Sequence, residues 1–326
     1  MDDEFYKAAK EALSNWNIHV ARLSLESKTE NIVFRVEDVL GIKYVLRLHR
    51  PGYHSLEDLK SEQQWTRALT DAGIEVPIPV ATRANDHYSR IRVHDHYRYA
   101  GILKWVDGYT MLSIIEDDVD LHVTAAQFRQ IGELLAKIHN QASTWTPPKD
   151  FSRHAFDAKG LMGEEPYWGR FWEARLTSKD EQHWLQEARF KIREVLTYCK
   201  KDPQVFSLIH ADLHPGNVIV NGEDLHIIDF DDSGFGWHQY DLSNAIFEYR
   251  DHEQFELMYT SLVEGYRHYR YLSDKTLAYL PLFLVIRALA LIGWLSDRPE
   301  HDERSYFPDL ITYAQQNLDD ALLRCP

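Results

Sequence analysis

The first hundred residues alternate between helical and β-strand spacing of apolar side chains. Residues 3–16 carry apolar side chains every three or four positions, which predicts an amphipathic helix. Runs of β-branched and aromatic residues then predict strands at 20–25, 31–37 and 43–50. Gly41 lies between the last two runs, where a hairpin turn is needed. This part of the chain therefore predicts a helix followed by antiparallel strands.

A further helix is predicted directly after these strands. Ser55 and Asp58 are spaced as the two halves of a capping box, a typical start of a helix. The helical spacing runs to about residue 71 and stops before Gly73. The Pro-rich run at 76–80 is extended, because proline excludes a helix there. Two more strands complete this part of the chain, at 88–93 and 97–103.

The pattern changes after residue 103, where helical spacing begins to dominate. The predicted helices cover 124–141, 165–200, 240–250, 252–270, 276–295 and 306–323. Two short strands interrupt them at 217–220 and 225–228. Asn221-Gly222, a dipeptide typical of hairpin turns, lies between these strands.

The order of elements predicts an α+β fold with two lobes. Residues 1–103 form a small antiparallel β-sheet lobe with one helix, and residues 104–109 form a hinge. Residues 110–326 form a larger, mainly helical lobe. A length of 326 residues provides ample material for such a core.

Composition narrows the classes of partner. The chain has 36 basic and 51 acidic residues, a formal net charge of -15. It therefore lacks the broad basic field that binding to nucleic acid or to an anionic membrane requires. The acidic balance favours a cationic substrate only slightly. The two cysteines, Cys199 and Cys325, cannot form a disulfide framework or a zinc site.

One apolar run, Leu277 to Leu295, is long enough to suggest a membrane span. Pro281 and Arg287 interrupt it and no basic cluster flanks it, which favours a buried core helix. The N-terminus is acidic and lacks the apolar core of a signal peptide. We therefore expect a cytoplasmic protein.

The segment "HADLHPGNVIV", which starts at His210, carries the candidate chemistry. His210, Asp212 and Asn217 precede the first strand of the predicted hairpin, and Asp229 ends the second. The start of one antiparallel strand lies beside the end of its partner, so Asn217 and Asp229 are expected at the same end of the hairpin. An amide and a carboxylate oxygen suit a hard cation such as Mg²⁺.

Asp212 lies in the loop that enters this hairpin. A carboxylate there can accept the proton of a hydroxyl that attacks a phosphorus atom. His210 follows an apolar run and is better suited to anchor the loop by hydrogen bonds. The alternative is a hairpin with acidic ends and no catalytic role, but this combination of spacings is rare.

The run from Leu208 to Ser243, with "HADLHPGN" and "IIDFDD", resembles the aminoglycoside phosphotransferase and choline kinase family, whose fold resembles that of protein kinases. His-Ala-Asp stands in place of His-Arg-Asp, and Asp-Phe-Asp in place of Asp-Phe-Gly. The resemblance implies an ATP- and Mg²⁺-dependent kinase with Asp212 as catalytic base. It also implies that Asn217 and Asp229 bind Mg²⁺ and that Asp241 organises the catalytic loop.

The resemblance extends to the N-terminal lobe, which it identifies as nucleotide-binding. Arg47 occupies the place of the phosphate-binding lysine, and Glu62 is its expected acidic partner, with Glu57 as the alternative. A glycine-rich loop is missing before residue 31, so Ser27, Thr29 or backbone N–H groups would contact phosphates. The hinge is expected to bind a purine through four residues: Leu103, Lys104, Trp105 and Val106.

The resemblance leaves the phosphate acceptor open. The family implies a small-molecule hydroxyl, as in aminoglycosides, choline, homoserine or sugars. The chain looks most similar to the stress-response and homoserine kinase branches, so a protein Ser/Thr kinase is the alternative. A nucleotide-binding pseudokinase is a third reading, against which the intact acids argue. The aromatic residues at 167–172 could hold an amine, or Arg170 a carboxylate.

Overall fold

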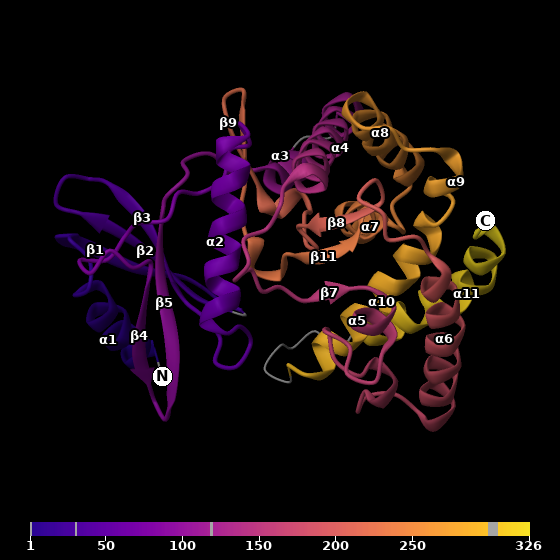
Figure 1. Ribbon diagram of the computed structural model, residues 1–326, viewed down its shortest axis with the longest axis horizontal. Helices are drawn as coiled ribbons and strands as arrows, with labels where there is room; N and C mark the ends of the chain where they lie inside the picture. Colours follow the sequence, from indigo (N-terminus) through magenta and orange to yellow (C-terminus); the bar gives the residue numbers. More distant parts are fainter. Residues whose placement is uncertain (1, 30, 118–119, 299–305) are drawn as a thin grey trace. The chain divides into compact units, whose positions relative to one another are not determined.

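The computed structural model describes residues 2–29, 31–117, 120–298 and 306–326 and resolves the chain into two compact units (Figure 1). The first unit comprises Met1–Tyr109, Pro147–Ser152 and Ile219–Asp231, and the remainder of the chain forms the second. The sequence pattern assigns all of 110–326 to one lobe, whereas 147–152 and 219–231 pack in the first unit.

The first unit is built on a five-stranded antiparallel sheet with the order β1-β2-β3-β5-β4. Its elements are α1 (Asp2–Leu13), β1 (Val20–Lys28), β2 (Ile32–Asp38), β3 (Lys43–Leu48), α2 (Leu56–Asp71), β4 (Tyr88–Val93) and β5 (His96–Lys104). All five predicted strands are present. Within its described residues the unit has two helices, α1 and α2, where the spacing predicted helices, although the fold as a whole was expected to have one helix in this lobe.

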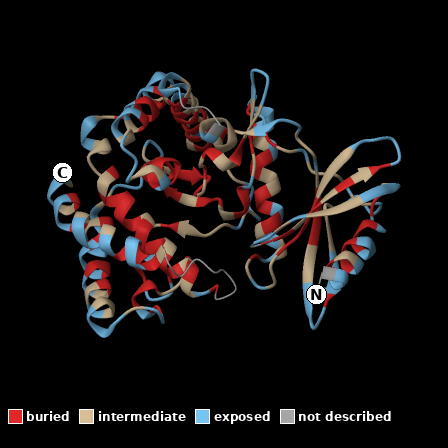
Figure 2. Cartoon of the chain, turned by 180° about the vertical axis from the view of Figure 1, so that it is seen from behind, coloured by how far each residue is buried: buried red, intermediate tan, exposed pale blue. Residues whose placement is uncertain are grey.

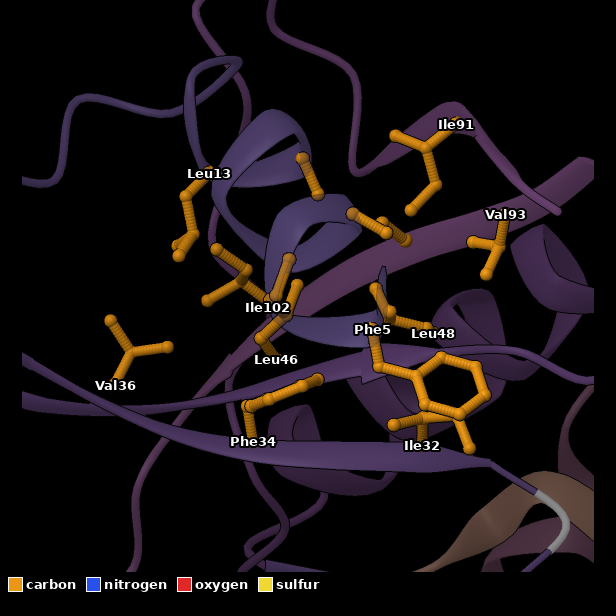
Figure 3. Close-up of a cluster of buried hydrophobic side chains, with 14 of the residues drawn as sticks. Phe5, Leu13, Ile32, Phe34, Val36, Leu46, Leu48, Ile91, Val93 and Ile102 are labelled. Carbon is orange, nitrogen blue, oxygen red and sulfur yellow. The ribbon is translucent and has the colours of Figure 1, made fainter. Parts of the chain in front are cut away.

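Apolar residues of α1 and of one sheet face form the core of the first unit. Figure 3 shows this cluster, which includes Phe5 from α1, Phe34 from β2 and Leu46 from β3. Successive side chains in a strand point to opposite faces. Leu46 and Leu48 are buried in the cluster, so Arg47 between them points to the other face of the sheet. Burial of the two leucines thus decides where Arg47 lies.

Helix α2 begins with the predicted capping box. Ser55 Oγ accepts a hydrogen bond from the Asp58 N–H at 3.1 Å, and the Asp58 carboxylate accepts one from the Ser55 N–H at 3.0 Å. These bonds satisfy backbone donors that the first turn of a helix leaves unpaired. Leu59, Trp65 and Glu62 lie on the buried side of the helix.

A hairpin of β9 (Val218–Asn221) and β10 (Asp224–Ile227) lies between Asn217 and Asp229 in the chain. β6 (Tyr109–Thr110) pairs with β9 in the same sheet. Gly222 has a φ of 64°, the left-handed conformation that a tight turn needs. Asn221 is the last strand residue, so the turn lies one position later than predicted. The Ile227 N–H donates to the carbonyl of Glu75 at 2.9 Å, which ties the hairpin to the chain after α2.

The second unit is mainly helical. Its helices are α3 (Met111–Asp117), α4 (Leu121–Thr144), α5 (Ala158–Met162), α6 (Lys179–Tyr198), α7 (His238–Ile246), α8 (Phe255–Tyr269), α9 (Asp274–Leu277), α10 (Leu280–Ser296) and α11 (Phe307–Arg324). A small sheet of β7 (Ala155–Phe156), β11 (Gly234–Trp237) and β8 (Phe206–Ile209) completes it.

The predicted helix over 165–200 is wrong in its first part. Residues 165–177 are irregular apart from the 3₁₀ turn Phe171–Glu173, and α6 begins only after its N-cap, Ser178. Pro166 and Gly169 explain the difference, because Gly169 has a φ of 90°, which a helix does not allow. The sheet formed by β7, β8 and β11 was not predicted. Two glycines in β11 weaken its strand signal.

Helix α10 contains most of the apolar run that is long enough to span a membrane. By length and composition Asp274–Ser296 could cross a bilayer, but 67% of its most apolar window is buried inside the protein. α10 packs against α7 and α11, and most of its residues are buried. Figure 2 shows the buried residues of the second unit in red. The interpretation as a core helix is therefore supported.

Helices α4 and α8 pack closely against each other at two glycines. A Cβ atom on Gly132 would lie 2.0 Å from the Leu262 carbonyl oxygen, and one on Gly265 would lie 2.0 Å from that of Arg129. Because both obstacles are backbone atoms, a side chain at either position would push the helices apart.

Replacing Gly132 with Ala tests this contact. Alanine has the higher helix propensity, by about 1 kcal/mol, but overpacking costs about 1–3 kcal/mol. We therefore expect a lower free energy of unfolding in chemical denaturation. Ala126→Gly, exposed on the same helix, is the control and should lose about 1 kcal/mol from propensity alone. A Gly132→Ala variant more stable than wild type would contradict the close packing.

Candidate active site

The loop after β8 is held by a buried carboxylate of α7. Asp241 accepts hydrogen bonds from the backbone N–H groups of His210 at 2.9 Å and Ala211 at 2.6 Å. The carboxylate is fully buried, so these N–H groups find a partner where water is excluded. Asp241 thus lies where the resemblance places a loop-organising acid.

Ala211 has a φ of 68°, a left-handed conformation that costs free energy for any residue except glycine. The Asn244 side-chain amide donates to the Ala211 carbonyl oxygen at 2.5 Å, and the Ala211 N–H donates to the Asp241 carboxylate. These two bonds hold the residue from both sides. Asn244 was not predicted as a site residue, and its only signal in the sequence is its position three residues after Asp241 in "YDLSN".

A second layer of buried groups supports Asp241. His139 of α4 lies with Nε2 3.0 Å from the Asp241 carboxylate, and its Nδ1 lies 2.9 Å from the Tyr266 hydroxyl. Burial lowers the pKa of His139 well below its usual value, so the ring is neutral. A neutral ring that donates from Nε2 must accept from Tyr266 at Nδ1. Burial also raises the pKa of Asp241, to about 6.

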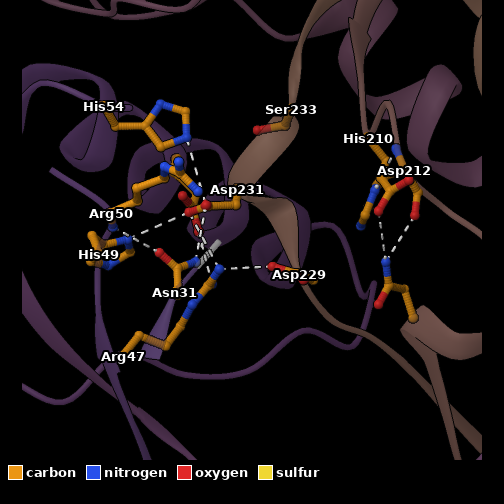
Figure 4. Close-up of polar contacts among 12 residues, drawn as sticks. Asn31, Arg47, His49, Arg50, His54, His210, Asp212, Asp229, Asp231 and Ser233 are labelled. Carbon is orange, nitrogen blue, oxygen red and sulfur yellow. Dashed lines mark hydrogen bonds and ion pairs between the residues drawn. The ribbon is translucent and has the colours of Figure 1, made fainter. Parts of the chain in front are cut away.

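Asp212 projects from the loop and is paired with Arg287 of α10. The guanidinium Nη2 lies 2.8 Å from Asp212 Oδ1. The Asn217 side-chain amide donates to the Asp212 carbonyl oxygen at 2.9 Å and lies 3.4 Å from its carboxylate (Figure 4). Asp212 is therefore fixed by groups on both sides.

Arg287 was not predicted as a site residue, because in the sequence it stands out only as a charge that argues against a membrane span. Burial alone would lower the pKa of its guanidinium, but the carboxylate of Asp212 outweighs burial and raises it. Arg287 is the single charged residue of α10. That isolated charge in an apolar helix is the signal that could have marked it as a site residue.

In the first unit, Arg47 is surrounded by three carboxylates. Its guanidinium lies 2.7 Å from Asp229 Oδ1, 3.3 Å from Asp231 Oδ1 and 3.8 Å from Glu62 Oε1 (Figure 4). Burial would lower the pKa of Arg47, but the three acids, Asp231 foremost, outweigh it and raise the pKa. The structure thus brings together Arg47, its expected partner Glu62 and Asp229.

Asp231 is the most enclosed acid of this group and was not predicted. Asn31 Nδ2 donates to its Oδ2 at 3.0 Å, and two histidines lie close, His49 at 3.5 Å and His54 at 3.7 Å. Burial would raise the pKa of Asp231, but Arg47 and the two histidines hold it well below its usual value. The carboxylate is therefore ionised and paired.

A pocket in the first unit is lined by Arg47, Glu62 and Asp229, together with Leu103 of the predicted purine site. Lys104, Trp105 and Val106 are not among its lining residues. The N–H groups of Lys104 and Trp105 donate to the carbonyls of Ile78 and Lys43, at 2.8 and 3.2 Å. Ser27 and Thr29 also lie outside the lining.

The aromatic segment at 167–172 belongs mostly to the core of the second unit. Trp168, Phe171 and Trp172 are buried. Arg170 forms ion pairs with Glu165 and Glu173 on the surface. Its charge is therefore compensated within the segment, which removes the reason to expect Arg170 at a substrate carboxylate.

Residues 23–274 match the phosphotransferase enzyme family. The chain belongs to this family. The match covers the hairpin, the Asp212 loop and Asp241, so the family predicted from "HADLHPGN" and "IIDFDD" is confirmed. The prediction that the protein is a kinase is confirmed with it.

Three related proteins resemble the chain over most of its length. A solved structure of a microcompartment-associated aminopropanol kinase is 29% identical, covers 97% of this chain and 96% of its own, and superposes with a TM-score of 0.82. An amicoumacin kinase solved with AMP-PNP and Ca²⁺ is 20% identical, covers 98% and 94%, and has a TM-score of 0.79. Stress response kinase A of Salmonella choleraesuis is 21% identical and covers 82% and 74%. The α+β, protein-kinase-like fold is confirmed.

Replacing Asp231 with Asn tests the charge network of the first unit. The native-state pKa of Asp231 is depressed, so its ion pairs stabilise the fold above the unfolded-state pKa of about 3.9. This contribution is lost as pH falls through the lower native-state pKa. Breaking a buried pair costs about 3–5 kcal/mol. We expect a loss of that size at pH 7, which shrinks as pH falls below about 4.

The measurement is urea denaturation of wild type and variant from pH 7 downward. Asp71→Asn, an exposed acid at the end of α2, is the control and should change stability little at any pH. A stability difference that stays constant across the pH range would show that the loss at Asp231 is not electrostatic.

Proposed function

We propose that this phosphotransferase moves the γ-phosphate of ATP to the hydroxyl of a small molecule, with Mg²⁺ as cofactor and Asp212 as the catalytic base. The observation that carries the proposal is the fixed Asp212 carboxylate, which is 24% exposed and projects from a loop held by Asp241. His210 and Asp241 support this loop rather than take part in the chemistry.

In the proposed reaction the protein mainly positions the two substrates and stabilises the charge of the transferred phosphate. The acceptor oxygen forms a bond to the γ-phosphorus as the bond from phosphorus to the oxygen of ADP breaks. Asp212 accepts the proton that the acceptor hydroxyl loses. Arg287 and Asn217 hold Asp212 so that its carboxylate meets the hydroxyl in one orientation.

The residues present suit a divalent cation. Asn217 donates from its amide nitrogen to Asp212, and its Oδ1 accepts no hydrogen bond within the part of the chain that is described. The Asp229 carboxylate is about half exposed. An amide and a carboxylate oxygen are donors that Mg²⁺ and Ca²⁺ both prefer, and the amicoumacin kinase was solved with Ca²⁺ and AMP-PNP. When bound, Mg²⁺ would neutralise phosphate charge.

We assign the nucleotide to the pocket of the first unit. Arg47 can bind two phosphate oxygens through its planar guanidinium, and Glu62 orients it. Leu103 and its neighbours Lys104, Trp105 and Val106 are proposed to contact the purine, which makes 1–103 the nucleotide-binding lobe, 104–109 the hinge and 110–326 the catalytic lobe. A cytoplasmic location, where ATP is abundant, agrees with this function.

The acceptor is proposed to be a small molecule because the aminopropanol kinase resembles the chain over nearly its whole length. The stress response kinase favours a second candidate, a protein Ser/Thr kinase. Incubation with labelled ATP and a cell lysate separates them. We expect label in the metabolite fraction, and a labelled polypeptide band on a gel would favour the protein kinase.

Replacing Asp212 with Asn tests the base. The variant keeps the size of the side chain but cannot take a proton, so turnover should fall about 10²- to 10⁴-fold. Nucleotide affinity should stay within about twofold, because Asp212 is not a pocket residue. The measurement pairs ADP release with nucleotide titration. Asp224→Asn, an exposed acid of β10, is the control. Unchanged turnover in Asp212→Asn would reject this role.

A further inference from the structure

The turn that carries Asp212 contains a second histidine, His214, to which the proposed reaction gives no role. The backbone of His214 closes this turn. Its N–H donates to the Asp212 carbonyl oxygen at 3.1 Å, and its carbonyl oxygen accepts from the Asn217 N–H at 2.9 Å. The same short segment thus holds the imidazole beside the candidate base.

A hydrogen bond to the backbone fixes the His214 ring. Its Nδ1 accepts from the Gly216 N–H at 3.1 Å and so caps the 3₁₀ turn Pro215–Asn217. A Cβ atom on Gly216 would lie 2.7 Å from His214 Cε1, so a side chain at that position would displace the ring. A ring nitrogen that accepts a hydrogen bond carries no proton, so the neutral ring carries its proton on Nε2.

The nitrogen that carries the proton lies next to the carboxylate of Asp212. His214 Nε2 is 3.8 Å from Asp212 Oδ2. This distance exceeds that of a hydrogen bond, so the contact is the attraction between an N–H dipole and a carboxylate. The side chains of His214 and Asp212 are 34% and 24% exposed, so an acceptor can approach both.

The two carboxylate oxygens of Asp212 are held unequally. Oδ1 lies 2.8 Å from the Arg287 guanidinium, a charge-assisted contact. Within the described residues the partners of Oδ2 are more distant: the Asn217 amide at 3.4 Å and His214 Nε2 at 3.8 Å. Because the strong contact occupies Oδ1, the lone pairs of Oδ2 are the more available and make it the better proton acceptor.

We propose that Oδ2 of Asp212 takes the proton of the acceptor hydroxyl, and that His214 is a positioning residue that sets the orientation of this oxygen. The proposal rests on the phosphotransfer function proposed above. The acceptor oxygen bonds to the γ-phosphorus, the bond from phosphorus to the oxygen of ADP breaks, and the proton passes to Oδ2. The imidazole keeps its own proton on Nε2. It limits rotation of a carboxylate that Arg287 holds at one oxygen only.

Two variants separate this positioning role from the capping of the turn, because each keeps one function of the ring. His214→Asn keeps an acceptor for the Gly216 N–H, since asparagine is a favoured cap, but has no N–H in place of Nε2. His214→Gln extends an amide N–H toward Asp212 but caps poorly. We expect kcat to fall about tenfold in His214→Asn, less than the roughly 10²-fold that a misplacement of about 1 Å costs.

The glutamine variant should show the opposite pattern. His214→Gln should keep kcat within about threefold of wild type, because its amide replaces the Nε2 N–H. Thermal unfolding should show a lower Tm for His214→Gln and a Tm close to wild type for His214→Asn. KM for ATP should stay within about twofold in both, because His214 does not line the nucleotide pocket.

His183→Asn is the matched control. This histidine of α6 is 78% exposed, and its replacement should change neither kcat nor Tm. The proposal is overturned if kcat is unchanged in His214→Asn, or if His214→Gln is no faster than His214→Asn. In either case the ring only caps the turn.

A double variant tests whether His214 acts through Asp212. In an Asp212→Asn background, His214→Asn should lower the residual turnover no further, because a positioning residue has no effect once the group that it positions is gone. A second loss of about tenfold in this background would mean that the histidine acts elsewhere, and would overturn the proposal.

The imidazole nitrogens report the contact without any reaction. In NMR spectra of the protein with isotope-labelled histidine, the signal of His214 Nε2 is the one lost in His214→Asn, and it should shift in Asp212→Asn. An unchanged signal would overturn the contact and the proposal with it. If kcat depends on Asp212 but not on His214, the phosphotransfer function stands and the positioning role alone fails. Unchanged turnover in Asp212→Asn rejects the base itself, whatever the signal shows.

Discussion

The second unit depends on one buried carboxylate, that of Asp241. It accepts hydrogen bonds from the backbone N–H groups of His210 and Ala211, which would otherwise be buried donors without a partner. This pairing holds Ala211 in a left-handed conformation and so decides the direction in which the chain presents Asp212. The position of the candidate base is therefore set by a residue of another element, and His139 behind Asp241 extends the same support.

In each unit, one acid of the site is buried and another is partly exposed. Asp241 and Asp231 are buried and fully engaged, by backbone N–H groups in one case and by Arg47 in the other. Asp212 and Asp229, in contrast, are partly exposed, although each also pairs with an arginine. Burying a charge is costly unless partners surround it. The buried acids thus fix the geometry, and the exposed acids remain accessible for chemistry.

Local patterns in the sequence predict single elements and the family. Period-two spacing locates β2, the pair Ser55 and Asp58 locates the start of α2, and the spacing of Asp212 and Asn217 identifies the family. It does not predict contacts between distant elements, such as Asn244 with Ala211. The irregular chain over 165–177 was misread as helix because its aromatic residues repeat at helical spacing yet are buried by neighbouring helices.

Arg287 shows how one residue can carry two different signals. In the sequence it interrupts an apolar run and argues against a membrane span, a property of the helix as a whole. In the fold its guanidinium lies 2.8 Å from Asp212 and sets the charge beside the candidate base. Coulomb interactions weaken with distance and are screened by salt. The local pair therefore matters more for the acceptor than the net charge of -15, which explains why composition left the substrate undecided.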